Sequence, residues 1–364
     1  MDFVLSELCQ QVLAARGAER PVIIQGGGTK SFYGEPAGRF DYPAAVTLDL
    51  SAYYGIVNYQ PSELVVTARG GTLLSDLEKA LDEQGQMLAF EPPRFGPQST
   101  VGGCVATGLS GPRRMAAGSL RDFILGAKLL DASGSVLSFG GEVMKNVAGY
   151  DVSRLLAGSM GIFGPLLEIS IKVAPKPFHE QTCIFHVEQA QALKLFNTWR
   201  GQPLPITATA WLQQESQGCL YVRLSGSESA VKAGLARIGG ELMAADASEA
   251  FWISLRDQTH PFFRAETLWR VALPPQHGPL PWNSTLIEWN GGQRWLTNVA
   301  DPDTLRAQVA KSGGHATLFR ARGDSERLPV FQSLPAGVKT INWRLKQELD
   351  PVGLFNPKRL FPDF

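Results

Sequence analysis

Apolar positions at two different spacings divide the first half of the chain into predicted elements. Over residues 3–15 they recur close to helical spacing up to Gly17, which predicts an amphipathic helix. Short apolar runs follow, and a second amphipathic helix is predicted over 73–85, closing at Gly85. We assign these later elements to a small α/β unit over about 18–95. Its predicted strands lie at 22–24, 45–50 and 63–68.

A second α/β unit is predicted over 96–175. It begins with a glycine-rich stretch, and Pro175 and Pro177 mark its end because proline interrupts helices and sheet ladders. The two units together form a predicted first domain over 1–175. The elements predicted in the second unit are strands at 123–132, 136–140 and 166–173 and a helix around 151–157.

The rest of the chain repeats an order of strand, helix and hairpin, which predicts a cap domain over 178–330. We expect two related halves forming one antiparallel sheet with helices on a face, so the whole chain is of the α+β class. The final segment, 331–364, should fold back onto the first domain after a helix that stops at Asp350. The elements predicted in the cap are strands at 183–187, 206–214, 219–226, 268–273, 284–290, 291–297 and 316–319 and helices at 189–199, 228–238 and 303–314.

The composition is that of a globular protein, with 44% hydrophobic and 19% charged residues. Basic and acidic residues balance at 34 each, so we expect no nucleic-acid partner. Asp2 and Glu7 stand where a secretory signal would carry basic and apolar residues, which predicts a cytoplasmic protein. Cys9, Cys104, Cys183 and Cys219 lie far apart without a CxxC pair, so we predict no disulfide framework, no internal iron–sulfur cluster and no metal site.

The motif VIIQGGGTKS at 22–31 places three glycines directly after a predicted strand. Glycine has no Cβ, so its N–H can approach a phosphate oxygen closely, and this makes the motif a candidate phosphate loop. A nucleoside-triphosphate loop needs glycine immediately before the lysine, whereas Thr29 precedes Lys30, and no dinucleotide-type GxGxxG opens a helix before Pro36. Taken alone, the motif fits a glycine-rich tight turn equally well.

Two further stretches have the same small-residue character, at 90–126 and at 145–173. Both alternate glycine and alanine with hydroxyl side chains, which is typical of backbone lying flat along a large ligand. Three separated stretches of this kind can line one extended cofactor.

The order of these motifs resembles the FAD-binding fold of the vanillyl-alcohol-oxidase (PCMH) type of flavoprotein, over essentially the whole chain. Within that family, the sequence at 145–164 and the terminal NPKRLF are most similar to those of the FAD-binding E subunits of bacterial glycolate oxidases. The resemblance implies a PCMH-type FAD-binding domain of two α/β subdomains, 18–95 and 96–175, with a short antiparallel-sheet cap. It rests on GGGT at 26–29, GGTLLSDL at 70–77, FEPP at 90–93, STVGGCVAT at 99–107, SGPRR at 110–114, SLRDFILG at 119–126, GYDVSRLLAGSMGIFG at 149–164 and DPVGLFNPKRL at 350–360.

The resemblance also implies cofactor-binding residues, most of them small. We expect five kinds of contact with the cofactor: a pyrophosphate loop, a strip along the diphosphate and ribityl chain, a backbone approach to the flavin ring, a strip near the adenosine end and a C-terminal loop that returns toward the isoalloxazine. In that order they correspond to Gly26, Gly27, Gly28, Thr29 and Lys30; Ser99, Gly102, Gly103 and Thr107; Gly111; Gly161 and Leu166; and Asn356.

Covalent attachment of the flavin is not expected. Family members that tether FAD commonly use a histidine in the first loop, where this chain has Thr29. Cys104 is the remaining nucleophile nearby, and its apolar neighbours favour burial. The resemblance therefore implies dissociable FAD.

Catalytic residues are not evident in the sequence. Flavin oxidation of a 2-hydroxy acid requires a base and a cation for the carboxylate, and the related catalytic subunits carry a histidine-rich metal site. Arg113 and Arg114 can orient a carboxylate or the pyrophosphate, but solvated charge explains them equally well. The five histidines have no partner at metal-ligand spacing; they are His179, His186, His260, His277 and His315.

The resemblance implies one subunit of a glycolate oxidase that converts glycolate to glyoxylate beside a catalytic flavoprotein subunit. An iron–sulfur subunit would pass the electrons to a quinone-type acceptor, and any membrane association would be peripheral and through these partners. The eight tryptophans all lie beyond residue 198, which suggests a partner-facing surface as well as core. The alternatives are a self-sufficient FAD enzyme using Arg113, His315 or Tyr150, and a non-catalytic scaffold.

Overall fold

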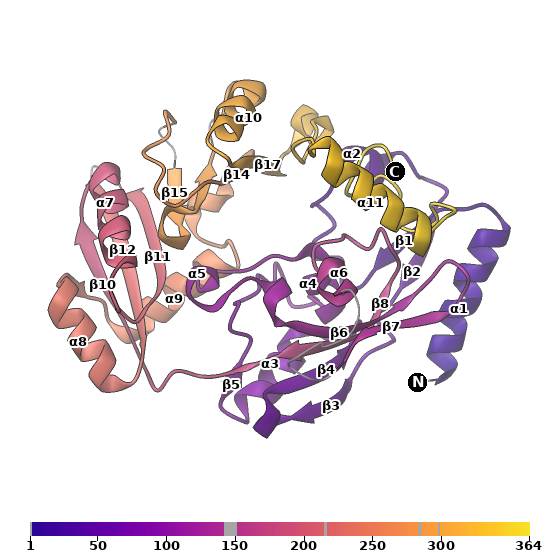
Figure 1. Ribbon diagram of the computed structural model, residues 1–364, viewed down its shortest axis with the longest axis horizontal. Coiled ribbons are helices and arrows are strands. Elements are labelled where there is room, and N and C mark those ends of the chain that lie inside the picture. The colour runs from indigo at the N-terminus through magenta and orange to yellow at the C-terminus, as the bar shows by residue number, and fades with distance from the viewer. Residues whose placement is uncertain (1, 142–150, 215–216, 283–284, 298) are drawn as a thin grey trace. The chain divides into compact units, whose positions relative to one another are not determined.

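The computed structural model describes residues 2–141, 151–214, 217–282, 285–297 and 299–364, and it divides into two compact units (Figure 1). The first unit comprises Met1–Leu109, Ser119–Pro175 and Ser333–Phe364, and the second comprises Ser110–Gly118 and Lys176–Gln332. Residues 110–118, which the sequence reading placed in the first domain, thus belong to the second unit. Among the helices of the described residues, none is long and apolar enough to cross a membrane.

A two-stranded parallel sheet of β1 (Val22–Gln25) and β2 (Val46–Asp49) carries the glycine loop of the first unit. Helix α1 (Asp2–Gly17) packs against it through Leu8 and Val12, which are almost fully buried. The C-terminal Phe355 lies in the same core. The glycine loop therefore extends from a strand that is held on several sides.

The other sheet of the first unit has five strands in the order β3-β4-β8-β6-β7, all paired antiparallel. Strand β4 pairs with β8, about a hundred residues later. The predicted division into subdomains 18–95 and 96–175 is therefore wrong for this sheet, because β4 is buried along most of its length and completes its ladder with the later strand. The strands are β3 (Ile56–Gln60), β4 (Val65–Arg69), β6 (Ile124–Leu130), β7 (Val136–Gly140) and β8 (Leu166–Lys172).

Short helices and a strand pair complete the first unit. The described elements are α2 (Pro36–Phe40), the 3-10 turn η1 (Pro61–Glu63), α3 (Leu74–Asp82), β5 (Gln86–Met87), α4 (Val101–Thr107), η2 (Leu120–Phe123), α6 (Val152–Leu156), β9 (Ala174–Pro175) and α11 (Ala336–Leu349).

The second unit is built on one eight-stranded sheet in the order β13-β10-β12-β11-β15-β16-β14-β17. All of its pairings are antiparallel, which agrees with the single antiparallel sheet predicted from the repeated order of elements. The strands are β10 (His179–His186), β11 (Ile206–Gln214), β12 (Gln217–Gly226), β13 (Glu241–Leu242), β14 (Leu268–Ala272), β15 (Thr285–Glu288), β16 (Gln293–Leu296) and β17 (His315–Arg320).

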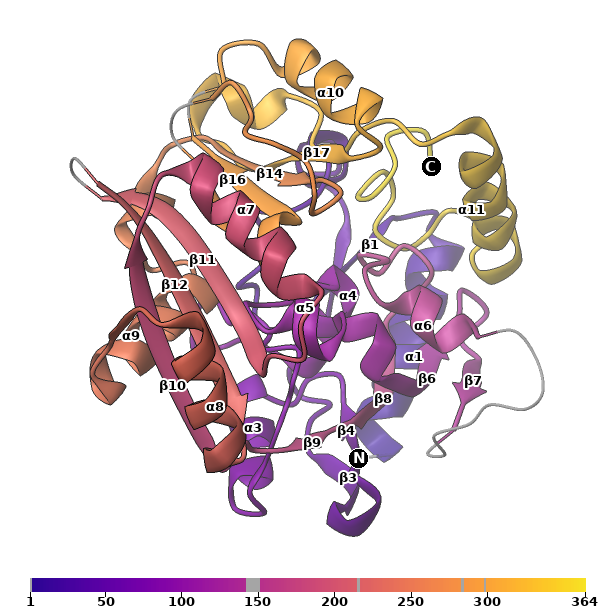
Figure 2. The ribbon, with the colours of Figure 1, turned by 60° about the vertical axis from the view of Figure 1, so that its left-hand side comes forward.

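Helices cover both faces of this sheet rather than one, as Figure 2 shows. Leu220, Val222 and Leu224 of β12 point into a core shared with α7 (Gln189–Arg200) and α8 (Glu228–Ile238). Tyr221 lies between them in sequence and therefore points to the opposite face, where its ring stacks on Phe251 of a helix at 4.0 Å between centroids. That helix, α9 (Ala245–Arg256), is absent from the sequence prediction.

The remaining described elements of the second unit lie near its edges and crossings. Helix α10 (Pro302–Lys311) packs in a core with β14, β16 and β17. The others are α5 (Arg114–Ala117), η3 (Pro261–Arg264), η4 (Trp289–Gly291) and η5 (Gly323–Arg327).

Candidate FAD-binding site

The loop after β1 lies with its backbone directly against the chain at 98–100. A Cβ built on Gly27 would lie 1.5 Å from the carbonyl oxygen of Gln98, and one on Gly26 would lie 2.5 Å from Oγ1 of Thr100. Gly28 has a φ of +67°, which glycine adopts without strain. Gly26 and Gly27 are thus required for contact between two chain segments, a reason different from the approach of a phosphate.

The backbone donors of this loop face no protein acceptor. Within the described residues, no hydrogen bond engages the N–H groups of Gly26, Gly27, Gly28 or Thr29. Four successive N–H groups without a hydrogen bond to the described protein are available to an anion such as a diphosphate. The residues present therefore fit the pyrophosphate of FAD.

Lys30 points inward from the same loop and joins it to the second strip. Its buried Nζ donates to Oγ of Ser99 at 2.6 Å and to the carbonyl of Arg94 at 3.3 Å. Lys30 and Ser99 thus bind each other, so both hold the loop in place. Burial raises the pKa of the nearby Cys104 thiol to about 12, although the charge of Lys30 acts in the other direction. Cys104 is therefore a protonated core thiol and a poor nucleophile.

The second strip forms α4 and depends on close backbone contact. A Cβ on Gly102 would lie 2.8 Å from the carbonyl oxygen of Gly70. Oγ1 of Thr100 caps the helix by accepting a hydrogen bond from the N–H of Gly103 at 3.2 Å. The Thr107 hydroxyl donates back to the carbonyl of Gly103 at 2.9 Å. The strip is a closely packed segment of small residues. Its contacts with the ribityl chain of FAD stay a prediction.

The third strip lies beside the end of α4. Met160 donates its N–H to the carbonyl of Ala106 at 2.8 Å, and Gly158 donates to that of Val105 at 2.9 Å. Gly161 has a φ of +73°. Leu166 is buried at the start of β8, so any role of this residue near the adenosine end would be through its backbone.

The side chain of Asn356 is used by the protein itself. Its Oδ1 accepts a hydrogen bond from the N–H of Ile24 at 2.8 Å, and its Nδ2 donates to the carbonyl of Met160 at 2.6 Å. A Cβ on Gly161 would lie 2.7 Å from this amide nitrogen. Asn356 therefore connects β1 to the third strip, and an approach of its loop to the isoalloxazine stays a prediction.

Gly111 belongs to the second unit, where its carbonyl accepts a hydrogen bond from Nε1 of Trp289 at 3.0 Å. Arg114 lies over the same ring, with its Cζ 4.5 Å from the centroid. These contacts explain why 110–118 packs with the second unit. Tyr150, a candidate of the self-sufficient alternative, lies outside the described residues.

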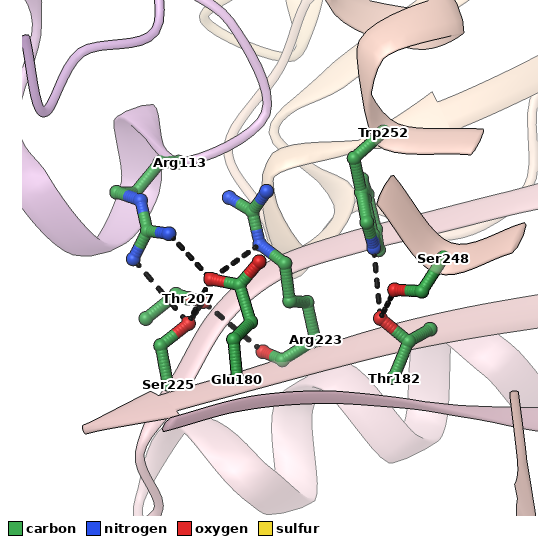
Figure 3. A network of polar contacts seen from close by, with 8 residues as sticks. All are labelled: Arg113, Glu180, Thr182, Thr207, Arg223, Ser225, Ser248 and Trp252. Carbon is green, nitrogen blue, oxygen red and sulfur yellow. Dashed lines mark hydrogen bonds and ion pairs between the residues drawn. The ribbon is translucent and has the colours of Figure 1, made fainter. Parts of the chain in front are cut away.

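Arg113 is neither a solvated charge nor a free carboxylate anchor. Its Nη2 donates to Oε2 of Glu180 at 2.7 Å, and its Nη1 to Oγ of Ser225 at 3.4 Å (Figure 3). Nε of Arg223 lies 3.7 Å from the same carboxylate oxygen. The side chains of both arginines are more than nine-tenths buried. This network organises one face of the cap sheet.

Histidines in the described part of the chain show no catalytic arrangement. Desolvation and then the charge of Arg270 hold the pKa of His315 below its usual value. Among described residues, no group of three or more His, Cys, Asp or Glu side chains is placed to hold a metal ion.

Comparison with known proteins identifies the family. A model described as an FAD binding domain matches residues 5–140. The chain is 43% identical over 359 residues to the glycolate oxidase subunit GlcE of Escherichia coli K12, covering 98% of this chain and 97% of that protein. The chain belongs to this family of glycolate oxidase subunits.

Two other relatives match less than half of the chain. The glycolate oxidase subunit GlcD of Bacillus subtilis is 31% identical over 38% of this chain and 29% of its own length. A D-lactate dehydrogenase of Anaerostipes hadrus is 33% identical over 36% of this chain and 27% of its own length. A solved alkyldihydroxyacetonephosphate synthase shares the fold, with a TM-score of 0.66 and 17% identity over 98% of this chain and 76% of that one.

These relationships confirm the PCMH-type FAD-binding fold and the FAD cofactor expected from the motifs. The family is one of FAD-dependent oxidoreductases, and the GlcE and GlcD relatives are each named as a subunit of glycolate oxidase. The loop at 26–29 and the strips at 99–107 and 158–161 are the segments that would hold the cofactor.

Proposed function

We propose that this chain is the FAD-holding accessory subunit of a three-part glycolate oxidase, working with a catalytic flavoprotein subunit and an iron–sulfur subunit. The observation that carries the proposal is the end-to-end 43% identity with GlcE, against a match to GlcD restricted to 38% of this chain. The chain thus resembles GlcE along its whole length but the GlcD type along only part of it.

The residues of this chain support a division in which it binds FAD and a partner subunit oxidises the substrate. FAD, when bound, would supply a two-electron acceptor for this oxidation chemistry. The chain's own residues would bind and orient the cofactor through the N–H groups of 26–29, which make no hydrogen bond within the described residues. A carboxylate substrate also needs a cation, but the guanidinium of Arg113 is already paired with Glu180. We infer that substrate oxidation belongs to the catalytic partner.

Electron transfer out of the complex needs a one-electron carrier. The four cysteines of this chain are unpaired thiols, and burial raises the pKa of Cys104 and Cys183. Since the chain offers no cysteine cluster in its sequence, an iron–sulfur partner is the carrier we propose, with a quinone-type acceptor beyond it. We further propose a cytoplasmic location, peripheral at the inner membrane through the partners.

We expect the FAD to be bound without a covalent link. Thr29 stands where tethering relatives carry histidine, and Cys104 is buried and protonated. Acid precipitation of the purified yellow chain should release the flavin into the supernatant, where its absorbance is measured. Colour that stays in the pellet after washing would show a covalent bond.

The division of work predicts that the isolated chain does not oxidise glycolate. The purified, FAD-loaded chain is mixed anaerobically with glycolate, and flavin bleaching is followed by absorbance. We expect no bleaching over minutes, although dithionite, as the control, bleaches the flavin. The complex with both partners should oxidise glycolate. Rapid bleaching of the isolated chain would instead support the self-sufficient enzyme, with Arg113→Ala and His315→Ala as the next variants.

A further inference from the structure

Lys346 and Asp350 form a fully enclosed ion pair at the end of α11, in the first unit. Their side chains are 2% and 0% exposed, and Nζ of Lys346 lies 2.6 Å from Oδ2 of Asp350. The same amine donates to the carbonyl of Ile162 and, at 3.1 Å, to that of Phe355. The amine of Lys346 therefore binds the backbone of two separate segments, the third strip at Ile162 and the C-terminal turn at Phe355.

Asp350 organises the turn that follows. Its carboxylate accepts hydrogen bonds from the N–H groups of Leu354 at 2.9 Å and Phe355 at 2.8 Å. The chain then runs alongside β1, because Val22 donates to the carbonyl of Leu354 at 2.8 Å and accepts from the N–H of Asn356 at 2.9 Å. The turn thus adds a short parallel segment to the free side of β1.

Asn356 completes the connection. Its amide binds Ile24 of β1 and Met160 of the third strip, while Lys346 binds Ile162 two residues further along that strip. The strand β1 ends one residue before Gly26. Three C-terminal side chains therefore connect the base of the glycine loop to the strip that contains Gly161. We call Lys346, Asp350 and Asn356 the C-terminal clasp.

A buried ion pair is a weak source of stability. Removing two charges from water is unfavourable, and well-packed apolar side chains of similar size often stabilise a fold as well or better. Desolvation lowers the pKa of Lys346, although the charge of Asp350 opposes that shift. Stability alone does not explain why charged side chains stand at positions 346 and 350. Their hydrogen bonds do, because they fix four backbone groups: the carbonyls of Ile162 and Phe355 and the N–H groups of Leu354 and Phe355.

We propose that the C-terminal clasp is a positioning device that sets the spacing between the glycine loop and the Met160–Ile162 strip and so determines the affinity for FAD. Its three residues act through the backbone and need not touch the cofactor. The proposal rests on FAD binding and is independent of the substrate and of the partners.

The test measures affinity and stability separately on the full chain. Flavin is removed, and the dissociation constant for FAD is measured from the quenching of flavin fluorescence, while urea unfolding of the apoprotein reports stability. We expect Lys346→Met to weaken FAD binding by the folded apoprotein at least about tenfold, the loss expected for charge-assisted hydrogen bonds. Lys339→Met, on the same helix in an exposed pair with Asp363, is the matched control and should change neither quantity.

A double variant separates positioning from stability. Lys346→Met with Asp350→Leu replaces the pair with apolar side chains and should raise the urea midpoint above that of Lys346→Met, because no lone charge stays buried. It should not recover FAD affinity, because the carbonyl of Ile162 and the N–H groups of Leu354 and Phe355 have lost their partners. Recovery of both quantities would overturn the proposal.

Asn356→Asp is the second probe, for the case in which Lys346→Met does not fold. It keeps an acceptor for the N–H of Ile24 but replaces the donor to Met160 with a carboxylate oxygen. We expect FAD binding to weaken about tenfold or more. Wild-type affinity in this folded variant would contradict a role for the clasp in spacing the two strips.

Discussion

Replacing Gly27 with alanine should weaken FAD binding about 100-fold. The added Cβ would lie 1.5 Å from the carbonyl oxygen of Gln98, a distance at which one of the two backbone segments must move. Overpacking of this kind costs about 3 kcal/mol, or roughly a factor of 100 in a binding constant when the displaced atoms form the site. The dissociation constant of FAD for the deflavinated chain, from flavin fluorescence, measures the effect.

Gly28→Ala is the control that separates collision from backbone strain. A Cβ there would have ordinary contacts, the nearest being Nε2 of Gln25 at 3.6 Å, but the φ of +67° disfavours alanine. Left-handed strain of about 1–2 kcal/mol predicts at most a moderate loss of affinity. Equal effects at Gly27 and Gly28 would show that loop conformation, and not its contact with Gln98, determines binding.

The sequence predicted local elements of this protein better than their partners. Most of the predicted helices and strands are present in the structure. They are recognisable because the spacing of apolar residues marks the type of element, and glycine or proline often marks its end. The pairing of β4 with β8 was not readable, since a strand buried along most of its length carries no mark of which distant segment completes its ladder. The helix α9 was missed for a similar reason, because small and polar residues interrupt its apolar stripe.

In the candidate site, too, the sequence predicted the types of residue but not the contacts that they make. Glycine-rich motifs identified the loop and both strips, because a missing Cβ is visible in the sequence. They could not show that Gly27 makes room for Gln98, or that Lys30 binds Ser99. The sequence does not single out the clasp, although Lys346 and Asp350 stand four residues apart at a helix end. That spacing is common on exposed helices, and only the structure shows that this pair is buried.

Glu180→Gln should destabilise the second unit by about 2–3 kcal/mol. The carboxylate lies against Arg113 and Arg223, and neutralising it leaves two largely buried guanidinium groups beside each other. Removing one partner of a buried pair costs about 3–5 kcal/mol, reduced here because the Glu180 side chain is 35% exposed. Seven of the eight tryptophans lie in the second unit, among them Trp252, whose ring centroid is 5.0 Å from Cζ of Arg223, so tryptophan fluorescence during urea unfolding reports mainly on this unit.

Glu228→Gln provides the matched control, because Glu228 and Lys232 form an exposed i,i+4 pair at 2.6 Å in the same unit. Such pairs contribute about 0.3–0.5 kcal/mol, so this variant should barely move the urea midpoint. FAD affinity should stay near the wild-type value in both variants, because the glycine loop and both strips belong to the first unit. If Glu180→Gln shifts the midpoint no further than Glu228→Gln, the carboxylate does not hold the arginines together. The burial of Arg113 and Arg223 would then depend on Ser225 and the stacking on Trp252.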